Sequence, residues 1–135
     1  MPAVGIRAKI EQVGARSRGI AVPPPGRTGW YGAGPRPGEP GRAVLVGHVD
    51  TRRGPGVFVR LRTLERGDDI EVRDRRARIH RYEVVTKERV PRTEFPVEDV
   101  YGSTARRVLV LITCGGPFRR GLGYRDNVIV YARAR

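Results

Sequence analysis

Short runs of apolar and β-branched residues, separated by glycine and proline, make up most of this chain. The 18 glycines and 11 prolines concentrate between residues 23 and 56, where they disfavour helices and end strands. The runs that predict strands are residues 43–46, 70–72, 79–85, 108–113 and 128–131. The pattern therefore predicts a mainly β protein with one or two short helices or 3-10 turns.

Two of these runs indicate how the strands are buried. Polar and apolar positions alternate in residues 79–84, which is typical of a strand with one buried face. Residues 108–112 are apolar at every position, so this strand needs cover on both faces. In an all-β chain, the middle of a sandwich or the wall of a closed barrel provides such cover. We expect a small closed barrel.

The segments between the strands add further elements. Gly67-Asp68-Asp69 precedes one strand and a short polar turn separates it from the next, so residues 70–85 predict a hairpin. Residues 95–101 predict one helical turn with Pro96 near its start. Residues 58–64 have apolar side chains at helical spacing, and a short helix is favoured there over a strand.

The length of 135 residues predicts a single domain over residues 1–135, with residues 1–29 as an N-terminal segment. No apolar run approaches the ~20 residues that a membrane-spanning helix needs. Residues 1–22 lack the charged, apolar and small-residue regions of a signal peptide. We therefore expect no membrane anchor in this chain.

A net charge of +13 raises nucleic acid or another polyanion as a partner. However, only Lys9 and Lys87 are lysines, and the arginines are spread along the whole chain, which is as typical of a GC-rich genome as of phosphate recognition. A β-barrel that binds nucleic acid also needs aromatic side chains among its arginines for base stacking. Only Tyr82 approaches that arrangement, so this function stays an alternative.

The single cysteine, Cys114, excludes an intramolecular disulfide. With only His48 and His80 beside it, the chain lacks the ligands for a structural zinc site. The 14 acidic residues are scattered and suggest no calcium cluster. We expect no metal and no cofactor.

Three residues at predicted strand ends could form a cysteine-based active site. Cys114 stands where an apolar strand meets a glycine turn, and His48 follows the strand 43–46 through Gly47. Arg125 precedes the last strand and would reach the same rim if the strands 108–113 and 128–131 pair. A thiolate, a proton donor and an oxyanion donor are the groups that acyl transfer requires.

Each of these residues also has an ordinary explanation. A free cysteine at the end of a buried strand is commonly inert, a single histidine is commonly a hydrogen-bonded structural residue, and an arginine is commonly solvated. His80 lies inside an alternating strand with no turn beside it. Asp50 could orient the imidazole of His48 or could simply form a turn.

The combination of motifs resembles the sortase family, whose order of active-site residues is histidine, cysteine and arginine. The motifs are Gly47-His48, Leu111-Ile112-Thr113-Cys114 and Tyr124-Arg125-Asp126-Asn127. Further stretches resemble the actinobacterial branch often called class F, namely residues 37–41, 46–50, 67–68 and 127–132. The resemblance runs from about Trp30 to the C-terminus.

The resemblance implies a closed eight-stranded sortase-type β-barrel and a two-step transpeptidation of a Leu-Pro-x-Thr-Gly-like sorting signal. Cys114 would attack the Thr carbonyl and cleave between Thr and Gly, His48 would protonate the leaving amine, and Arg125 would stabilise the oxyanion. An amine of a cell-wall precursor would then resolve the thioester. Water as the acceptor would instead make the protein a cysteine peptidase or hydrolase, and the sequence does not separate the two.

The resemblance also implies the surroundings of the active site. Residues 91–107 correspond to the loop that walls the sorting-signal groove in sortases, with Phe95, Val97 and Tyr101 as candidate contacts, while ordinary packing explains these three equally well. Thr113 is a further candidate substrate contact. The expected protein is a monomer that does not bind nucleic acid. It would work at the extracytoplasmic face of the membrane of a Gram-positive bacterium, where an anchor absent from this chain would tether it.

Overall fold

The computed structural model describes residues 9–13, 15–16, 19–20, 27–31, 34–47, 50–51, 54–55, 63–73, 76–119 and 123–135. The strands are β1 (Lys9–Val13), β2 (Ala15–Arg16), β3 (Gly19–Ile20), β4 (Arg27–Tyr31), β5 (Gly41–Val46), β6 (Asp50–Thr51), β7 (Gly54–Pro55), β8 (Asp69–Arg73), β9 (Ile79–Pro91), β10 (Arg107–Arg119) and β11 (Gly123–Ala134). The helical turns are η2 (Arg92–Glu94) and α1 (Val97–Tyr101). The prediction of a mainly β chain with short helical turns is confirmed.

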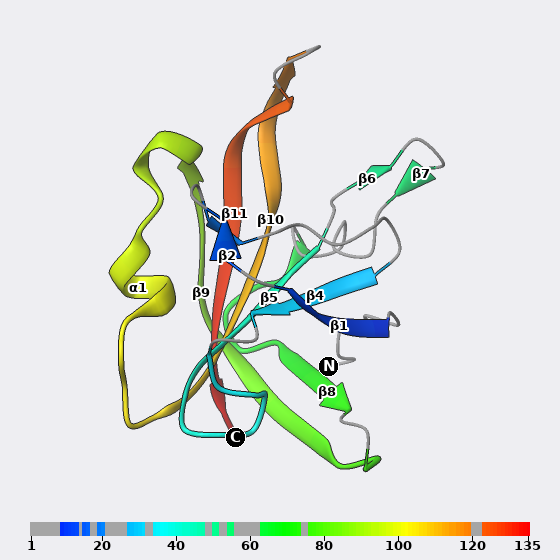
Figure 1. The fold of residues 1–135 in the computed structure, drawn as a ribbon, viewed down its shortest axis with the longest axis vertical. Coiled ribbons are helices and arrows are strands. Elements are labelled where there is room, and N and C mark those ends of the chain that lie inside the picture. Colours follow the sequence, from blue (N-terminus) through cyan, green and yellow to red (C-terminus); the bar gives the residue numbers. More distant parts are fainter. Residues whose placement is uncertain are drawn as a thin grey trace.

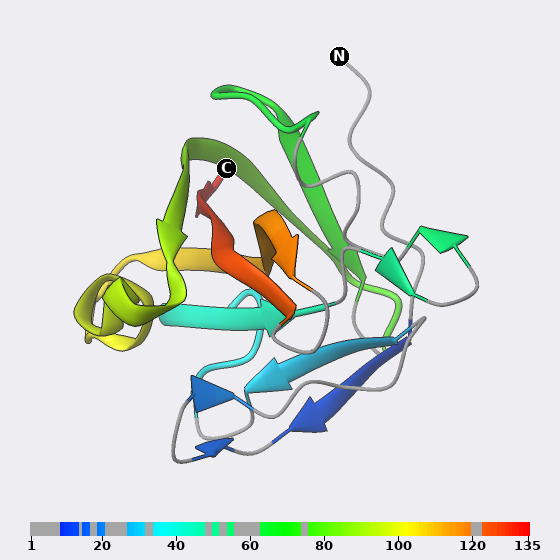
Figure 2. The ribbon, with the colours of Figure 1, turned by 90° about the horizontal axis from the view of Figure 1, so that it is seen from above.

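Among the described residues, seven strands form one sheet in the order β1-β4-β5-β10-β11-β9-β8. Strand β10 lies in the middle, parallel to β5 and antiparallel to β11, and β11 is antiparallel to β9. The sheet curls around its long axis, and the β10–β11 hairpin extends beyond the other strands (Figures 1 and 2). Closure into a barrel and the count of eight strands stay predictions, because part of the chain lies outside the described residues.

The predicted local elements are largely confirmed. Strands β8 and β9 pair antiparallel over residues 69–83 and form the predicted hairpin. Helix α1 begins at Val97 directly after Pro96, at the position expected for the helical turn. The predicted short helix at 58–64 falls mostly outside the described residues, which resume at Thr63.

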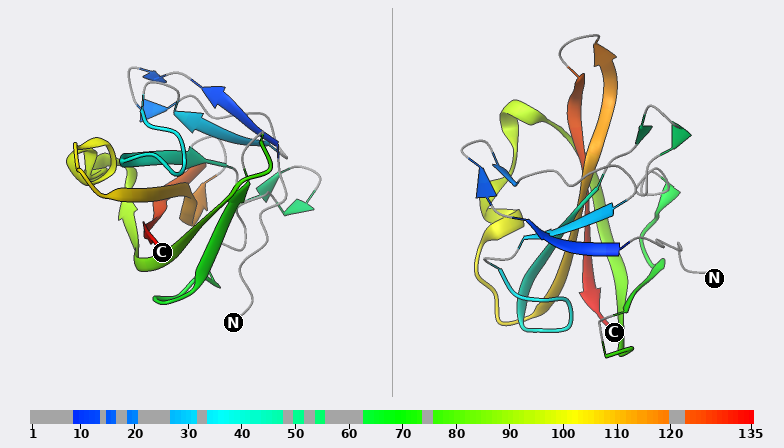
Figure 3. Two further views of the ribbon diagram at one scale, coloured as in Figure 1. Left: turned by 90° about the horizontal axis from the view of Figure 1, so that it is seen from below. Right: turned by 45° about the vertical axis from the view of Figure 1, so that its right-hand side comes forward.

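Strand β10 is covered on both faces, as its unbroken apolar pattern predicts. Its odd-numbered residues Leu109 and Leu111 belong to an inner core within the curl, and its even-numbered residues Val110 and Ile112 belong to an outer core beneath α1. Helix α1 lies on the outer side of the sheet in both views of Figure 3. Each fully buried side chain of this size stabilises the fold by about 1.5–3 kcal/mol, so β10 anchors both layers.

A β-bulge in β9 changes which face its side chains occupy. Val84 pairs with Ala132 and Thr86 with Tyr131, so Val85 has no partner in the register and is 40% exposed. One extra residue inverts the alternation of a strand. Beyond the bulge, Arg89 pairs with Val128, which places Arg89 on the same face of the sheet as the inner core.

Hydrogen bonds attach the loop before β5 to the end of the sheet that is opposite the tip of the β10–β11 hairpin. The backbone N–H of Gly38 donates to the Tyr82 hydroxyl at 2.6 Å, and the Trp30 indole N–H donates to the carbonyl of Pro35 at 2.9 Å. Gly38 has φ +94°, and a Cβ there would lie 2.4 Å from Nδ1 of His80. Glycine is therefore required at position 38 for both its backbone conformation and its missing side chain.

Candidate active site

Cys114 lies within strand β10 and not at its end. The predicted glycine turn after Cys114 is wrong, because β10 continues to Arg119 with an irregular register between Gly115 and Phe118. Glycines let a strand bulge without ending its ladder of hydrogen bonds. The backbone of Cys114 pairs with that of Asn127 on β11, while its side chain lies outside the described part of the structure.

Arg125 lies on the neighbouring strand, close to the partner of Cys114. The predicted pairing of the strands 108–113 and 128–131 is confirmed. Strand β11 begins at Gly123, earlier than predicted, so Arg125 stands inside this strand and two residues before Asn127. The described backbone therefore brings Cys114 and Arg125 to one region of the β10–β11 hairpin. The side chain of Arg125 lies outside the described part.

His48 lies outside the described residues, but the residue before it is fixed. The backbone N–H of Gly47 donates to the carbonyl of Ile112 at 3.2 Å. The hydroxyl of Thr113 donates to the carbonyl of Gly47 at 2.9 Å, and Thr113 is only 1% exposed. The end of β5, from which the chain continues to His48, is thus bound to the segment of β10 that leads to Cys114.

An ion pair between a buried carboxylate and a largely exposed arginine, which the sequence did not single out, lies beside Cys114 and Arg125 in the sheet. Oδ2 of Asp126 is 3.3 Å from Nε of Arg89, and the Asp126 side chain is 3% exposed. The sequence pattern could have predicted that Asp126 is buried, because Asp126, Val128 and Val130 occupy alternate positions on one face of β11. An acidic residue at the first position of such a series is expected to be buried and paired.

The residues proposed from α1 and its approach pack on the outer face of the sheet. The rings of Phe95 and Tyr101 are tilted by 37° with centroids 6.1 Å apart, and both are partly buried against the outer core. Packing therefore accounts for much of their surface, and substrate contact stays a prediction for both. Val97 begins α1, and its side chain lies outside the described part.

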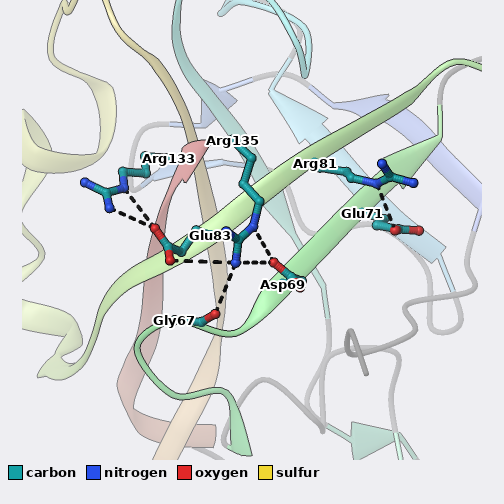
Figure 4. Close-up of polar contacts among 7 residues, drawn as sticks. All are labelled: Gly67, Asp69, Glu71, Arg81, Glu83, Arg133 and Arg135. Carbon is teal, nitrogen blue, oxygen red and sulfur yellow. Dashed lines mark hydrogen bonds and ion pairs between the residues drawn. The ribbon is translucent and has the colours of Figure 1, made fainter. Parts of the chain in front are cut away.

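The positive charge of the chain is partly balanced where the C-terminal end of β11 lies beside β9, with β8 on the other side of β9 (Figure 4). Arg135 pairs with Asp69 and Glu83, and Arg133 donates to the same Glu83 carboxylate at 2.8 Å. Each such exposed pair contributes about 0–1 kcal/mol. Tyr82, the aromatic residue considered for base stacking, is 1% exposed. The feature that could have favoured a nucleic-acid surface is therefore buried.

No helix among the described residues is both long and apolar enough to cross a bilayer. No three histidine, cysteine, aspartate or glutamate side chains in this part of the chain gather into a group that could hold a metal ion.

Several solved structures with a similar fold are described as sortases. A Clostridium perfringens Sortase D5 transpeptidase is 22% identical with a TM-score of 0.62, covering 82% of this chain and 62% of that chain. Sortase A from Corynebacterium diphtheriae is 18% identical with a TM-score of 0.66, covering 80% and 47%. Sortase C-1 from Actinomyces oris is 22% identical with a TM-score of 0.66, covering 82% and 59%. The chain thus spans about half to three-fifths of their lengths, and the expected sortase-type β fold is confirmed.

The sequence comparisons give a second, independent result. No curated protein matches this chain. The family model described as the Sortase domain matches residues 1–135, which is the whole chain. The chain therefore belongs to the sortase family.

Proposed function

We propose that residues 1–135 form a single sortase catalytic domain that carries out cysteine-dependent transpeptidation. Membership of the family supports this class of activity in general. The observation that carries the assignment of the active site is the bonding between Gly47 and β10, together with the pairing of Cys114 and Asn127. These contacts support a site in which His48, Cys114 and Arg125 meet at one end of the β5–β10–β11 group.

The proposed reaction begins with attack of the Cys114 thiolate on the carbonyl carbon of Thr in a Leu-Pro-x-Thr-Gly-like signal. Arg125 donates hydrogen bonds to the oxyanion that forms, because its guanidinium is always charged and presents several N–H groups. As the Thr–Gly bond breaks, His48 gives a proton to the departing glycine amine. The products of this step are a thioester on Cys114 and a free C-terminal fragment.

The second step transfers the acyl group to a new amine. His48 accepts a proton from the attacking amine of a cell-wall precursor, the amine attacks the thioester carbonyl, and the Cys114 sulfur leaves. The product contains a new amide bond and the enzyme is regenerated. Water as the nucleophile would give slow hydrolysis through the same residues.

The outer core at the β10–β11 pair supports a position for the substrate beside the proposed active site. Ile112 and Ile129 face the outer core, and even positions on β10 pair with odd positions on β11. Phe95 and Tyr101 pack against this outer core. We therefore propose that residues 91–107, including Val97, wall the sorting-signal site, with Thr113 supporting it from β10.

The biological setting follows from the family and is part of the proposal. Sortases are cell-surface enzymes of Gram-positive bacteria, so the proposed partners are secreted surface proteins that carry a sorting signal and a cell-wall amine. The class F motifs favour an actinobacterial source and a protein tethered at the extracytoplasmic face of the membrane. A monomer needing no cofactor suffices for this chemistry.

Mass spectrometry tests the proposal directly. The purified chain is mixed with a Leu-Pro-x-Thr-Gly peptide and a glycine-type amine, with the Cys114→Ala variant in parallel. A ligated product that is lost in the variant supports the proposal. Cleavage without ligation would favour a hydrolase. No cleavage over many hours, with tight and salt-dependent binding to DNA or RNA, would favour the nucleic-acid alternative.

A further inference from the structure

The ion pair between Asp126 and Arg89 lies directly beside the proposed catalytic residues without belonging to them. Asp126 follows Arg125 in the chain and pairs in register with Gly115, the residue after Cys114. On its other side Asp126 pairs with Pro91, where residues 91–107 begin. This one residue therefore adjoins the strand of Cys114, the position of Arg125 and the start of the proposed substrate wall.

The pair bridges two neighbouring strands diagonally on the inner face. Arg89 is opposite Val128, two residues along β11 from Asp126, and the bulge at Val85 is what places Arg89 on this face. The Asp126 side chain is 3% exposed, whereas that of Arg89 is 60% exposed. A carboxylate that is buried so deeply requires partners that compensate for its lost hydration. The contact thus fixes β11 to β9 at one register position.

Asp126 and Arg125 are consecutive residues of β11, and the backbone of Cys114 lies on the neighbouring strand β10. A shift or twist of β11 at Asp126 would therefore also move the backbone of Arg125 relative to that of Cys114. Oxyanion stabilisation depends steeply on donor placement, and a misplacement of about 1 Å can cost on the order of 100-fold in rate.

We propose that Asp126 is a positioning residue for Arg125 and that Arg89 holds its carboxylate in place. The inference rests on the proposed function, since it needs Arg125 to act as the oxyanion donor. Asp126 makes no contact with substrate in this scheme. Its contribution is to set the backbone of β11 at the point where Arg125 is presented to the reacting carbonyl.

The test uses isosteric or charge-removing variants of the whole chain. Asp126→Asn keeps the size of the side chain and removes its charge, and Arg89→Gln removes the partner from a largely exposed position. Arg81→Gln is the matched control, because Arg81 forms a similar cross-strand pair with Glu71 at 3.2 Å, with side chains 64% and 46% exposed. This pair joins β9 to β8, near the C-terminal end of β11 and not near Asp126. Thermal unfolding checks that each variant is folded.

Two rates separate positioning from a general loss of structure. The rate of acylation by the sorting-signal peptide depends on the oxyanion donor, whereas alkylation of Cys114 by iodoacetamide depends on its thiolate and access. Asp126→Asn should lower the acylation rate on the order of 10- to 100-fold. It should leave the alkylation rate within about threefold. Arg89→Gln should act in the same direction, and Arg81→Gln should change neither rate.

A double-mutant cycle with Arg125→Ala gives the decisive result. If Asp126 acts through Arg125, the loss from Asp126→Asn should largely disappear when Arg125 is already alanine. Full additivity of the two losses would overturn the inference, as would wild-type acylation in both Asp126→Asn and Arg89→Gln. If Asp126→Asn does not fold, Arg89→Gln replaces it in the same double-mutant cycle with Arg125→Ala. A wild-type chain that forms no acyl-enzyme would instead overturn the proposed function, and this inference with it.

Discussion

The hydroxyl of Thr113 donates a hydrogen bond of 2.9 Å to the backbone carbonyl of Gly47. This bond joins the residue before Cys114 to the residue before His48, across the parallel pair β10 and β5. The N–H of Gly47 also donates to Ile112, so the end of β5 is held by two consecutive residues of β10. The relative position of the proposed nucleophile and proton donor is therefore set partly by a buried side chain that need not react.

Replacing Thr113 with valine should test this support, because valine keeps the shape and removes the hydroxyl. We expect a loss of about 1–3 kcal/mol in the free energy of unfolding, since the buried carbonyl of Gly47 loses a donor. The ligation rate should also fall. Chemical denaturation and peptide ligation measure the two effects. Thr113→Ser, which keeps the donor, should recover most of both, and a valine variant as stable and active as serine would contradict the prediction.

Substitution of the proposed catalytic residues should separate their roles. Cys114→Ala and His48→Ala should abolish turnover, because each removes a group that the reaction requires. Arg125→Ala should lower kcat/KM by on the order of 100-fold or more, the scale for losing an oxyanion donor. Steady-state ligation of a fluorescent peptide measures all three. Near-normal turnover in any folded variant removes that residue from the mechanism.

Sequence patterns predicted much of the fold because burial controls them directly. The unbroken apolar run at 108–112 required two covered faces, and the structure has a core on each side of β10. The alternation in residues 79–84 likewise predicted a strand with one buried face, and in the structure Tyr82 and Val84 are its buried residues. The bulge at Val85 was not predictable in this way, since it depends on the register with Tyr131 and Ala132 on another strand.

The candidate site was predictable only in part, for a related reason. The order of histidine, cysteine and arginine and their neighbouring motifs identified the family. Gly115 and Gly116 suggested a turn, yet pairing with β11 continues the strand beyond them. The ion pair of Asp126 and Arg89 needs both the bulge and the strand order, so neither residue stood out among so many arginines and scattered carboxylates.

Gly38→Ala should destabilise the fold through both backbone and side-chain effects. Position 38 has φ +94°, and the new Cβ would lie 2.4 Å from Nδ1 of His80. We expect a loss of about 2–3 kcal/mol or more, measured by chemical denaturation. Gly67→Ala is the matched control, because Gly67 has φ +93° but nothing within 4 Å of its added Cβ. Equal losses at the two positions would show that the contact with His80 does not matter.

Stability should fall at alkaline pH because of two tyrosines. Burial raises the pKa of Tyr82 above its usual 10.0, and burial together with the Glu88 carboxylate raises that of Tyr131. Above about pH 10 the unfolded chain therefore loses these protons first, so the free energy of unfolding decreases as pH rises, by at most about 1.4 kcal/mol per pH unit for each tyrosine. Below pH 10 their contribution is fully present. Urea denaturation between pH 8 and 11.5 measures this slope, which Tyr82→Phe and Tyr131→Phe should each reduce above pH 10. Slopes unchanged from wild type in both variants would rule out these tyrosines as its source.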